Sequence, residues 1–273
     1  MPRAHSGAID SPKNARVVAA RALHSARGRR TAGAFLAEGP HAVAAAVGAS
    51  FGIREIFVTD EAADRERSLM RDLARSGAAI NTVTDRALRA VAETVTPQGV
   101  VAVVDLPGAS PLPDSLRLVA LLEQCSDPGN AGTVIRTADA VGADAVAFGP
   151  GSADVWSGKC IRSSAGSVFN LPVVTALDPV AAVEMVRARG CQVFATAADG
   201  DVDLDDLSGS SRLAAPTAWV FGSEAHGLGA ALAGLVDGVV RIPIDGKAES
   251  LNLSAAAAIC LYSSARVQRL NRH

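Results

Sequence analysis

The sequence predicts an α/β fold in which short apolar strands alternate with helices, arranged as two domains. Short apolar runs recur along the chain, polar or glycine-rich turns separate them, and helical periodicity fills the intervals. The length of 273 residues suits two domains, and a hydrophobic content of 49% supplies enough apolar side chains for two cores. In the second domain, the β-helix-β alternation predicts a mostly parallel sheet with helices on both faces.

The first domain is predicted over residues 1–105. Basic and apolar positions alternate at helical spacing over residues 12–28, and a basic turn then leads into an apolar strand that ends before Gly39. Further elements are expected as a helix at 40–48, a strand at 53–58, a helix at 61–76, and strands at 79–83 and 100–104.

A proline-rich segment separates the two domains. Residues 106–113 contain three prolines, and proline fixes φ and removes a backbone donor, so residues 106–115 are expected to form a stiff linker. The second domain then spans residues 116–273, with a helix at 133–141. Its strands are expected at 116–122, 145–148, within 166–174, and at 193–196, 219–221 and 239–242.

Charge is distributed unevenly along a chain whose formal net charge is only −2. Residues 1–30 carry seven basic side chains against one acid, Asp10, whereas residues 199–206 carry five aspartates. A basic N-terminal region indicates a polyanionic partner such as nucleic acid. On charge alone, a simply solvated tail explains the pattern equally well.

The four cysteines lie far apart and form no C-x-x-C pair, so their spacing excludes a zinc site of the usual kind and fits reduced thiols. The sequence has no signal-type apolar segment and no apolar run long enough to cross a membrane. A cytoplasmic protein that contacts no membrane is therefore expected.

Three enzyme classes lose support because their motifs are incomplete in this chain: Rossmann-type oxidoreductases, P-loop NTPases and serine hydrolases. The pair Gly149 and Gly151 imitates a dinucleotide-binding fingerprint, but the third glycine position holds Asp154. Gly158-Lys159 imitates a phosphate-binding loop, but Cys160 replaces its serine or threonine and no glycine lies five residues earlier. Gly222-Ser223 is not a nucleophile elbow, because Phe221 precedes it.

Three polar clusters remain as candidates for a site. The first is residues 130–142, NAGTVIRTADAVG, where Asn130 is expected just before a helix and Arg136 on its second turn. The second is residues 222–227, GSEAHG, a glycine-bracketed loop that allows close backbone approach to a ligand. The third is residues 250–254, SLNLS, before an alanine-rich helix. Taken singly, each is explained as well by a helix cap or a strand-to-helix turn.

In this order and spacing, the three clusters closely resemble the signature motifs of the SpoU/TrmH family of RNA ribose 2′-O-methyltransferases, within the SPOUT class. The resemblance covers nearly the whole chain, and the long motif EQCSDPGNAGTVIR at residues 123–136 is most similar to 23S rRNA members that include the thiostrepton-resistance type. It implies a C-terminal trefoil-knotted methyltransferase domain and a smaller N-terminal α/β substrate-binding domain similar to a ribosomal protein of the L30e type. The knot is implied by the resemblance alone.

The resemblance also implies S-adenosyl-L-methionine as the methyl donor, with no metal. Carried over by position, the donor contacts are Gly222, Ile242 and Leu251. The residues implied at the reacting ribose are Asn130, Arg136, Glu224, Ser250 and Asn252. Those expected to bind RNA are Arg27, Arg29, Arg30 and Arg162. Arginine stays protonated in proteins, so Arg136 is expected to bind a phosphate or the developing alkoxide rather than to act as a simple base.

The family further implies a homodimer in which the catalytic arginine serves the partner's donor site. Two positions depart from the family pattern: Ile244 replaces a frequent methionine, and Ser263 replaces a frequent glutamate.

Structured RNA, with 23S rRNA favoured, is the substrate that the family resemblance implies. A tRNA ribose methyltransferase and a catalytically inert RNA-binding paralogue are the alternatives. The methylated nucleotide does not follow from the sequence, because RNA shape selects it.

Overall fold

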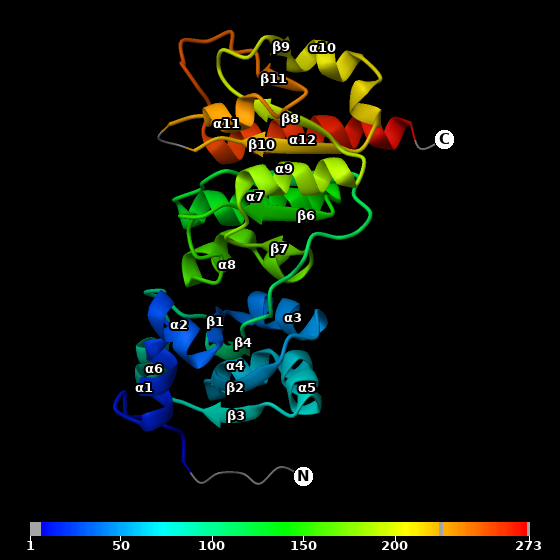
Figure 1. Cartoon of the computed structure of the whole chain (residues 1–273). Helices are drawn as coiled ribbons and strands as arrows, with labels where there is room; N and C mark the ends of the chain where they lie inside the picture. The colour runs from blue at the N-terminus through cyan, green and yellow to red at the C-terminus, as the bar shows by residue number, and fades with distance from the viewer. Residues whose placement is uncertain (1–6, 224–225, 272–273) are drawn as a thin grey trace. The chain divides into compact units, whose positions relative to one another are not determined.

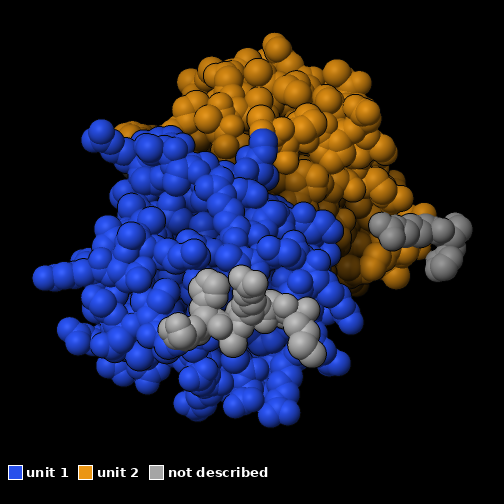
Figure 2. Space-filling model, turned by 90° about the horizontal axis from the view of Figure 1, so that it is seen from below, with its two compact units in different colours: residues 1–108, 156–169 blue, residues 109–155, 170–273 orange. Residues whose placement is uncertain are grey.

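The computed structural model describes residues 7–223 and 226–271 (Figure 1). The chain forms two compact units, one made of residues 1–108 and 156–169 and the other of residues 109–155 and 170–273 (Figure 2). The first passage between the units, at residues 108–109, falls inside the segment predicted as a linker. Residues 156–169 were expected in the second domain, but they belong to the first unit.

The first unit contains a four-stranded sheet in the order β1-β4-β2-β3. Strand β4 is antiparallel to both β1 and β2, whereas β2 and β3 are parallel. The strands are β1 (Ala34–Glu38), β2 (Ile53–Val58), β3 (Ala79–Thr82) and β4 (Val100–Asp105). The run Val100 to Val104 is buried throughout, as its uninterrupted apolar character predicts for a central strand.

The helices of the first unit differ from the prediction in three places: the helix expected at 12–28 is divided, the helix expected at 61–76 is divided at Glu66, and α6 was not predicted. They are α1 (Ala15–Ala22), α2 (Ala26–Ala32), α3 (Pro40–Gly48), α4 (Asp60–Arg65), α5 (Arg67–Ser76) and α6 (Asp85–Val91). The single helix expected at 12–28 is divided in two, because Ser25 caps α2 by accepting a hydrogen bond from the Gly28 amide at 3.0 Å. The basic turn expected after residue 27 is therefore helical.

Residues 156–169 join the first unit through aromatic packing. The segment contains α8 (Gly158–Ser164) and a 3₁₀ turn, η1 (Ser167–Phe169). Trp156 lies 4.9 Å from Phe35 between ring centroids, and Phe169 lies 5.0 Å from Phe51 in an edge-to-face arrangement. Large aromatic surfaces buried together in this way provide much of the energy of a core. This explains why the segment packs with the first unit despite its position in the sequence.

The second unit contains a seven-stranded sheet in the order β7-β6-β5-β10-β8-β11-β9. Every strand pair in it is parallel, as the sequence predicted for this domain. The strands are β5 (Leu118–Leu122), β6 (Ala145–Phe148), β7 (Val173–Val174), β8 (Gln192–Thr196), β9 (Val202–Asp203), β10 (Thr217–Phe221) and β11 (Gly238–Arg241). Only β9 has no counterpart among the predicted strands, because it lies within the aspartate-rich stretch.

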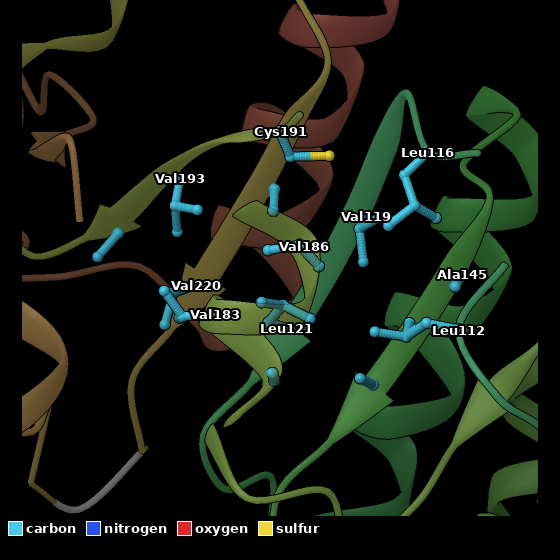
Figure 3. Close-up of a cluster of buried hydrophobic side chains, with 14 of the residues drawn as sticks. Leu112, Leu116, Val119, Leu121, Ala145, Val183, Val186, Cys191, Val193 and Val220 are labelled. Carbon is cyan, nitrogen blue, oxygen red and sulfur yellow. The ribbon is translucent and has the colours of Figure 1, made fainter. Parts of the chain in front are cut away.

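Helices cover both faces of this sheet. They are α7 (Pro128–Val141), α9 (Pro179–Ala188), α10 (Leu204–Gly209), α11 (Ala230–Ala233) and α12 (Leu253–Leu270), with a 3₁₀ turn, η2 (Arg212–Ala214). On one face, Val183 and Val186 of α9 pack on Val119, Leu121 and other strand residues (Figure 3). On the other, buried Trp219 of β10 donates a hydrogen bond to Ser264 of α12 at 2.8 Å.

The segment predicted as a linker is partly built into the second unit. Leu112 and Leu116 are buried in the cluster of Figure 3, and the carbonyl of Pro113 accepts a hydrogen bond from Arg189 at 2.9 Å. The prolines therefore stiffen a segment in which Leu112 is part of a core, and Leu116, the first residue after the predicted linker, is buried in the same cluster.

Candidate functional site

A cavity of about 980 Å³ opens beyond the carboxyl ends of β8, β10 and β11. Ligands of open parallel sheets bind at this edge, because the loops that follow the strands meet there. The described residues that form the wall are 196–201, 222–223, 226–228, 233, 239–240, 242, 244, 250–253 and 256. The cavity is lined by Gly222, Ile242 and Leu251, which the sequence predicted as donor contacts far apart in the chain.

The loop after β10 closes on itself through its backbone. Ser223 and Gly227 exchange two backbone hydrogen bonds of 2.8 and 2.9 Å. A Cβ atom at position 222 would overlap the backbone of Gly227 and Leu228, so only glycine fits there. A close approach to a ligand was expected at Gly222, whereas its closest approach is to the backbone of its own loop. Glu224, the acid predicted in this loop, lies outside the described residues.

Glu123 holds the far end of the same loop. It follows β5, and its carboxylate accepts a hydrogen bond from the Gly229 amide at 3.0 Å, just before α11. A hydrogen bond from a backbone amide to a charged carboxylate is stronger than one between two neutral groups. Glu123 begins the motif at residues 123–136, but no role was predicted for it. The strand order that brings it to Gly229 cannot be deduced from a linear sequence pattern.

Two asparagines from the first and third clusters meet beside the cavity. Asn252 caps α12 by accepting from the Ser254 and Ala255 amides at 2.9 and 3.4 Å. Its amide nitrogen donates to the Asn130 oxygen at 3.2 Å. The Ser254 hydroxyl has two acceptors within reach, the Asn252 oxygen at 2.7 Å and the same Asn130 oxygen at 3.3 Å. Asn252 is therefore both a helix cap and a link between two clusters that lie 122 positions apart.

The helix α7 begins earlier than the sequence predicted. Asp127 is its N-cap and accepts from the Gly129 and Asn130 amides at 2.7 and 3.0 Å, while Pro128 occupies the first helical position. Asn130 consequently lies inside the first turn instead of before the helix.

The remaining predicted catalytic residues are distributed unevenly. Ser250 lines the cavity together with Asn252. Arg136 is exposed on α7, does not line the cavity, and forms no hydrogen bond or ion pair with a described residue. Within one chain, Asn130 and Asn252 are in contact and Ser250 and Asn252 line the cavity, whereas Asn130 and Arg136 are not among the lining residues.

The four arginines expected to bind RNA all lie in the first unit but differ in their surroundings. Arg27 and Arg30 are exposed on α2. Arg29 is 4% exposed, and its guanidinium donates to the carbonyls of Leu23 and His24 at 2.8 and 3.0 Å, where it satisfies the end of α1. Arg162 lies 3.4 Å from the Glu93 carboxylate and 3.7 Å from that of Glu38.

The cavity wall has a defined chemical character. Among the described residues that line it, the charged side chains are Asp199 and Asp201, His226 is the other titratable group, and none is a lysine or arginine. Alanine, valine, leucine and isoleucine side chains with loop backbone form most of the remaining wall. Such a surface suits a planar apolar group whose edges bind to backbone, and it disfavours a polyphosphate, which requires cationic partners.

The described residues contain neither a cluster of metal ligands nor a membrane-spanning helix. Among residues 7–223 and 226–271, no three acidic, histidine or cysteine side chains gather closely enough to hold a metal ion. Across the same residues, no helix combines the length and the apolar character needed to span a membrane.

Solved structures and curated proteins similar to this chain agree on its class. A crystal structure described as an AdoMet-bound rRNA methyltransferase from Sinorhizobium meliloti superimposes with a TM-score of 0.84 at 30% identity, covering 95% of this chain and 97% of that one. The 23S rRNA (guanosine(2553)-2′-O)-methyltransferase RlmP of Bacillus subtilis is 37% identical over 254 residues, 93% of this chain and 97% of the relative. A 23S rRNA (uridine(2479)-2′-O)-methyltransferase of Streptomyces viridochromogenes is 33% identical over 271 residues, 95% of this chain and 92% of that one.

The fold and the cavity thus define an α/β RNA methyltransferase with an N-terminal substrate-binding domain. The family model described as the SpoU rRNA Methylase family matches residues 117–262, and one described as the MRM3-like substrate binding domain matches residues 14–102. The chain belongs to the SpoU rRNA methylase family. This confirms the resemblance inferred from the three polar clusters.

Proposed function

We propose that this protein transfers a methyl group from S-adenosylmethionine to a ribose 2′-hydroxyl of structured RNA, with 23S rRNA as the substrate. The observation that supports this most directly is the cavity that gathers Gly222, Ile242 and Leu251 beside the linked pair Asn130 and Asn252. Both named relatives are 23S rRNA ribose methyltransferases and cover most of the chain. They methylate different nucleotides, so the proposal stops at the class of RNA.

The cavity fits the methyl donor by its chemistry. Ile242 and Leu251 provide apolar surface for an adenine ring, and the loop backbone at residues 222–223 and 226–228 provides polar groups for its edges. When bound, S-adenosylmethionine supplies an electrophilic methyl group on a positively charged sulfur. The role of the protein is then to hold the ribose hydroxyl in line with that methyl group and to assist loss of its proton.

We assign the positioning of the ribose to Asn130 and Ser250. Asn130 is held by Asn252 and Ser254, so its amide is oriented before the substrate arrives. Arg136 binds the neighbouring phosphate or the alkoxide as it forms, which lowers the effective pKa of the hydroxyl. Glu224 pairs with the guanidinium of Arg136 in this scheme, and Asn252 positions Asn130. No metal ion takes part.

Arg136 reaches a donor cavity only if a second subunit supplies it, and we therefore propose a homodimer. The exposed apolar residues of α12 support this arrangement, because Ile259, Tyr262 and Leu270 are 38%, 55% and 68% exposed. Large apolar side chains left exposed on one helix are typical of an interface. Helix α7, which carries Arg136, packs against α12 within the chain, so both helices belong to the proposed contact region.

The proposed domain organisation is an RNA-binding domain at 1–105, a linker at 106–115 and a methyltransferase domain at 116–273. We infer an L30e-like fold for the RNA-binding domain and a trefoil knot in the methyltransferase domain, both on family membership. Exposed Arg27 and Arg30 are the proposed phosphate contacts. Arg29 and Arg162 act in this scheme mainly by shaping the RNA-binding surface, since both guanidinium groups have protein partners. An rRNA substrate would place the protein in the cytoplasm.

The experiment that tests this function separates donor binding from methyl transfer. Arg136→Ala should bind S-adenosylmethionine with wild-type affinity in calorimetry, yet lose at least a hundredfold in transfer of labelled methyl to rRNA, the scale of losing one electrostatic donor. Full activity of this variant would contradict the assigned role. Mapping of ribose methyl groups in total RNA, with and without the gene, identifies the substrate. A missing methyl group in tRNA alone would favour the tRNA alternative, and donor binding without any transfer would favour the inert paralogue.

A further inference from the structure

The wall of the donor cavity is negatively charged on one side. Asp199 and Asp201 lie in the turn between β8 and β9 and line the cavity, where both side chains are exposed to it and to solvent. They are the only residues with a formal charge at neutral pH among the described lining residues, apart from the titratable His226. The wall therefore carries carboxylates without a compensating lysine or arginine.

The turn that holds these two aspartates is fixed to the sheet. The Ala197 amide donates to the Val240 carbonyl at 3.1 Å, and the Gly200 amide donates to the Ala197 carbonyl at 3.3 Å. Gly200 itself is buried, and a Cβ atom there would lie only 2.7 Å from the Val239 oxygen and from the Arg241 nitrogen. Because only glycine allows this approach, the turn lies against β11 and keeps residues 199 and 201 at the cavity.

One cation lies near the turn, and it has its own partners. The Arg241 guanidinium donates to the Gly200 carbonyl at 3.3 Å and to the Asp203 carboxylate at 3.0 Å. Arg241 does not line the cavity, and the carboxylate of Asp203 offsets its charge. The remaining acids of the stretch, Asp205 and Asp206, are exposed on α10 and do not line the cavity either. Asp199 and Asp201 thus form a distinct pair within the aspartate-rich stretch.

We propose that Asp199 and Asp201 make the cavity prefer the positively charged methyl donor over the spent product, and so favour product release. This inference rests on the proposed function. In the reaction, the bond from sulfur to methyl breaks, a bond from methyl to the ribose oxygen forms, and the hydroxyl proton leaves. The sulfur keeps the electron pair and becomes a neutral thioether, so S-adenosylhomocysteine carries one positive charge fewer than the donor.

A carboxylate pair in the wall distinguishes these two ligands without touching the sulfur. Both ligands share the adenosine and the amino-acid end, so contacts to those parts contribute equally to both affinities. Only the sulfonium charge differs, and its attraction to each nearby carboxylate is weak in a solvent-filled cavity. At a separation of several ångströms in a watery medium, each carboxylate favours the donor roughly threefold. The pair together therefore favours it by about tenfold.

The test compares the affinities of both ligands in isosteric variants. Calorimetry with S-adenosylmethionine and S-adenosylhomocysteine is carried out on the wild type, Asp199→Asn, Asp201→Asn and the double variant. The donor-to-product affinity ratio should fall roughly threefold in each single variant and about tenfold in the double variant. Asp205→Asn and Asp206→Asn are the matched controls, because they remove the same charge outside the cavity, and their ratio should stay at the wild-type value.

A second measurement needs no variant. Salt screens the attraction between separated charges, so the affinity ratio of the wild type should decrease as the ionic strength rises. A ratio insensitive both to salt and to the cavity substitutions would overturn the inference while leaving the proposed function intact. Equal losses for both ligands would also overturn it, because they would place the aspartates at the shared amino-acid end. A wild type that binds neither ligand would overturn the proposed function together with the inference.

Discussion

At the scale of single residues, Asn252 combines a structural and a chemical task in one side chain. Its oxygen caps α12, and its nitrogen donates to the Asn130 oxygen. Asparagine is the common cap that can also donate in this way, since aspartate and serine caps present no amide nitrogen. The two tasks use different atoms of the amide, and two substitutions can therefore separate them.

Asn252→Asp should keep the cap and lose the link to Asn130. The carboxylate still accepts from the Ser254 and Ala255 amides, so the melting temperature should stay near the wild-type value. Methyl transfer to rRNA should drop severely, because a carboxylate facing the Asn130 oxygen cannot donate. Asn252→Ala is the control that loses both, with a cost of about 1 kcal/mol in unfolding free energy. Wild-type activity in the aspartate variant would show that the link does not matter for catalysis.

The thiol of Cys191 gives a prediction about pH. Burial, reinforced by the charge of Asp144 and partly opposed by Arg189, raises the pKa of Cys191 to about 11 from its ordinary 9.0. The folded state holds the thiol proton more tightly than the unfolded state, so the protonated thiol contributes to the free energy of unfolding. This stabilising contribution is fully present below pH 9 and is lost as the pH rises to 11. The wild-type melting temperature should therefore fall more steeply over that interval than that of Cys191→Ala. Parallel curves would contradict this origin of the pH dependence.

At the scale of elements, the loop after β10 depends on Gly222. An alanine there would overlap the backbone of Gly227 and Leu228, so the loop must shift away from the cavity. Gly222→Ala should weaken binding of S-adenosylmethionine about tenfold or more, a loss typical of misplaced site residues. Gly234→Ala is the matched control, because the same Cβ meets no atom within 4 Å. Unchanged donor affinity in Gly222→Ala would show that this loop is not part of the donor site.

The elements also show where sequence reasoning succeeded and where it could not. Uninterrupted apolar strands such as β4, β6 and β10 were predicted because burial on both faces leaves a clear local pattern. The break between α1 and α2 depends on one serine cap, and β9 pairs through only two residues, so neither has a strong local signal. In the sequence, Asp199 and Asp201 are two of five aspartates over residues 199–206 and nothing local distinguishes them. Only the position of their turn against β11 separates them from the neighbouring acids.

The same limit applies to the basic residues. Arg29 belongs to a cluster of arginines whose composition indicates an RNA-binding surface, yet its guanidinium is buried at the end of α1. Arg27 and Arg30 precede and follow it on the same short helix and stay exposed. A helix presents successive residues on different faces. Because α2 was predicted as a basic turn and not as a helix, the sequence could not indicate which of its arginines is buried.

At the scale of the whole molecule, the position of Arg136 leads to a prediction about assembly. In the proposed dimer, this arginine completes the donor site of the partner, so two damaged chains can restore each other. Arg136→Ala should be inactive alone, and Gly222→Ala should be nearly inactive at donor concentrations well below its weakened dissociation constant, where the assay is run. In a heterodimer of the two, one site combines an intact donor cavity with an intact arginine. Random exchange of subunits in an equal mixture should therefore restore about a quarter of the wild-type rate.

The measurement is transfer of labelled methyl to rRNA after the two variants have been mixed and allowed to exchange. Each variant incubated alone at the same total concentration is the control. If Arg136 served the cavity of its own chain, one site of every heterodimer would lack the arginine and the other the loop, and mixing would restore nothing. Sedimentation of Tyr262→Glu gives an independent check. A charge at this exposed position of α12 should weaken the dimer and reduce activity in parallel, because the dimer supplies the arginine.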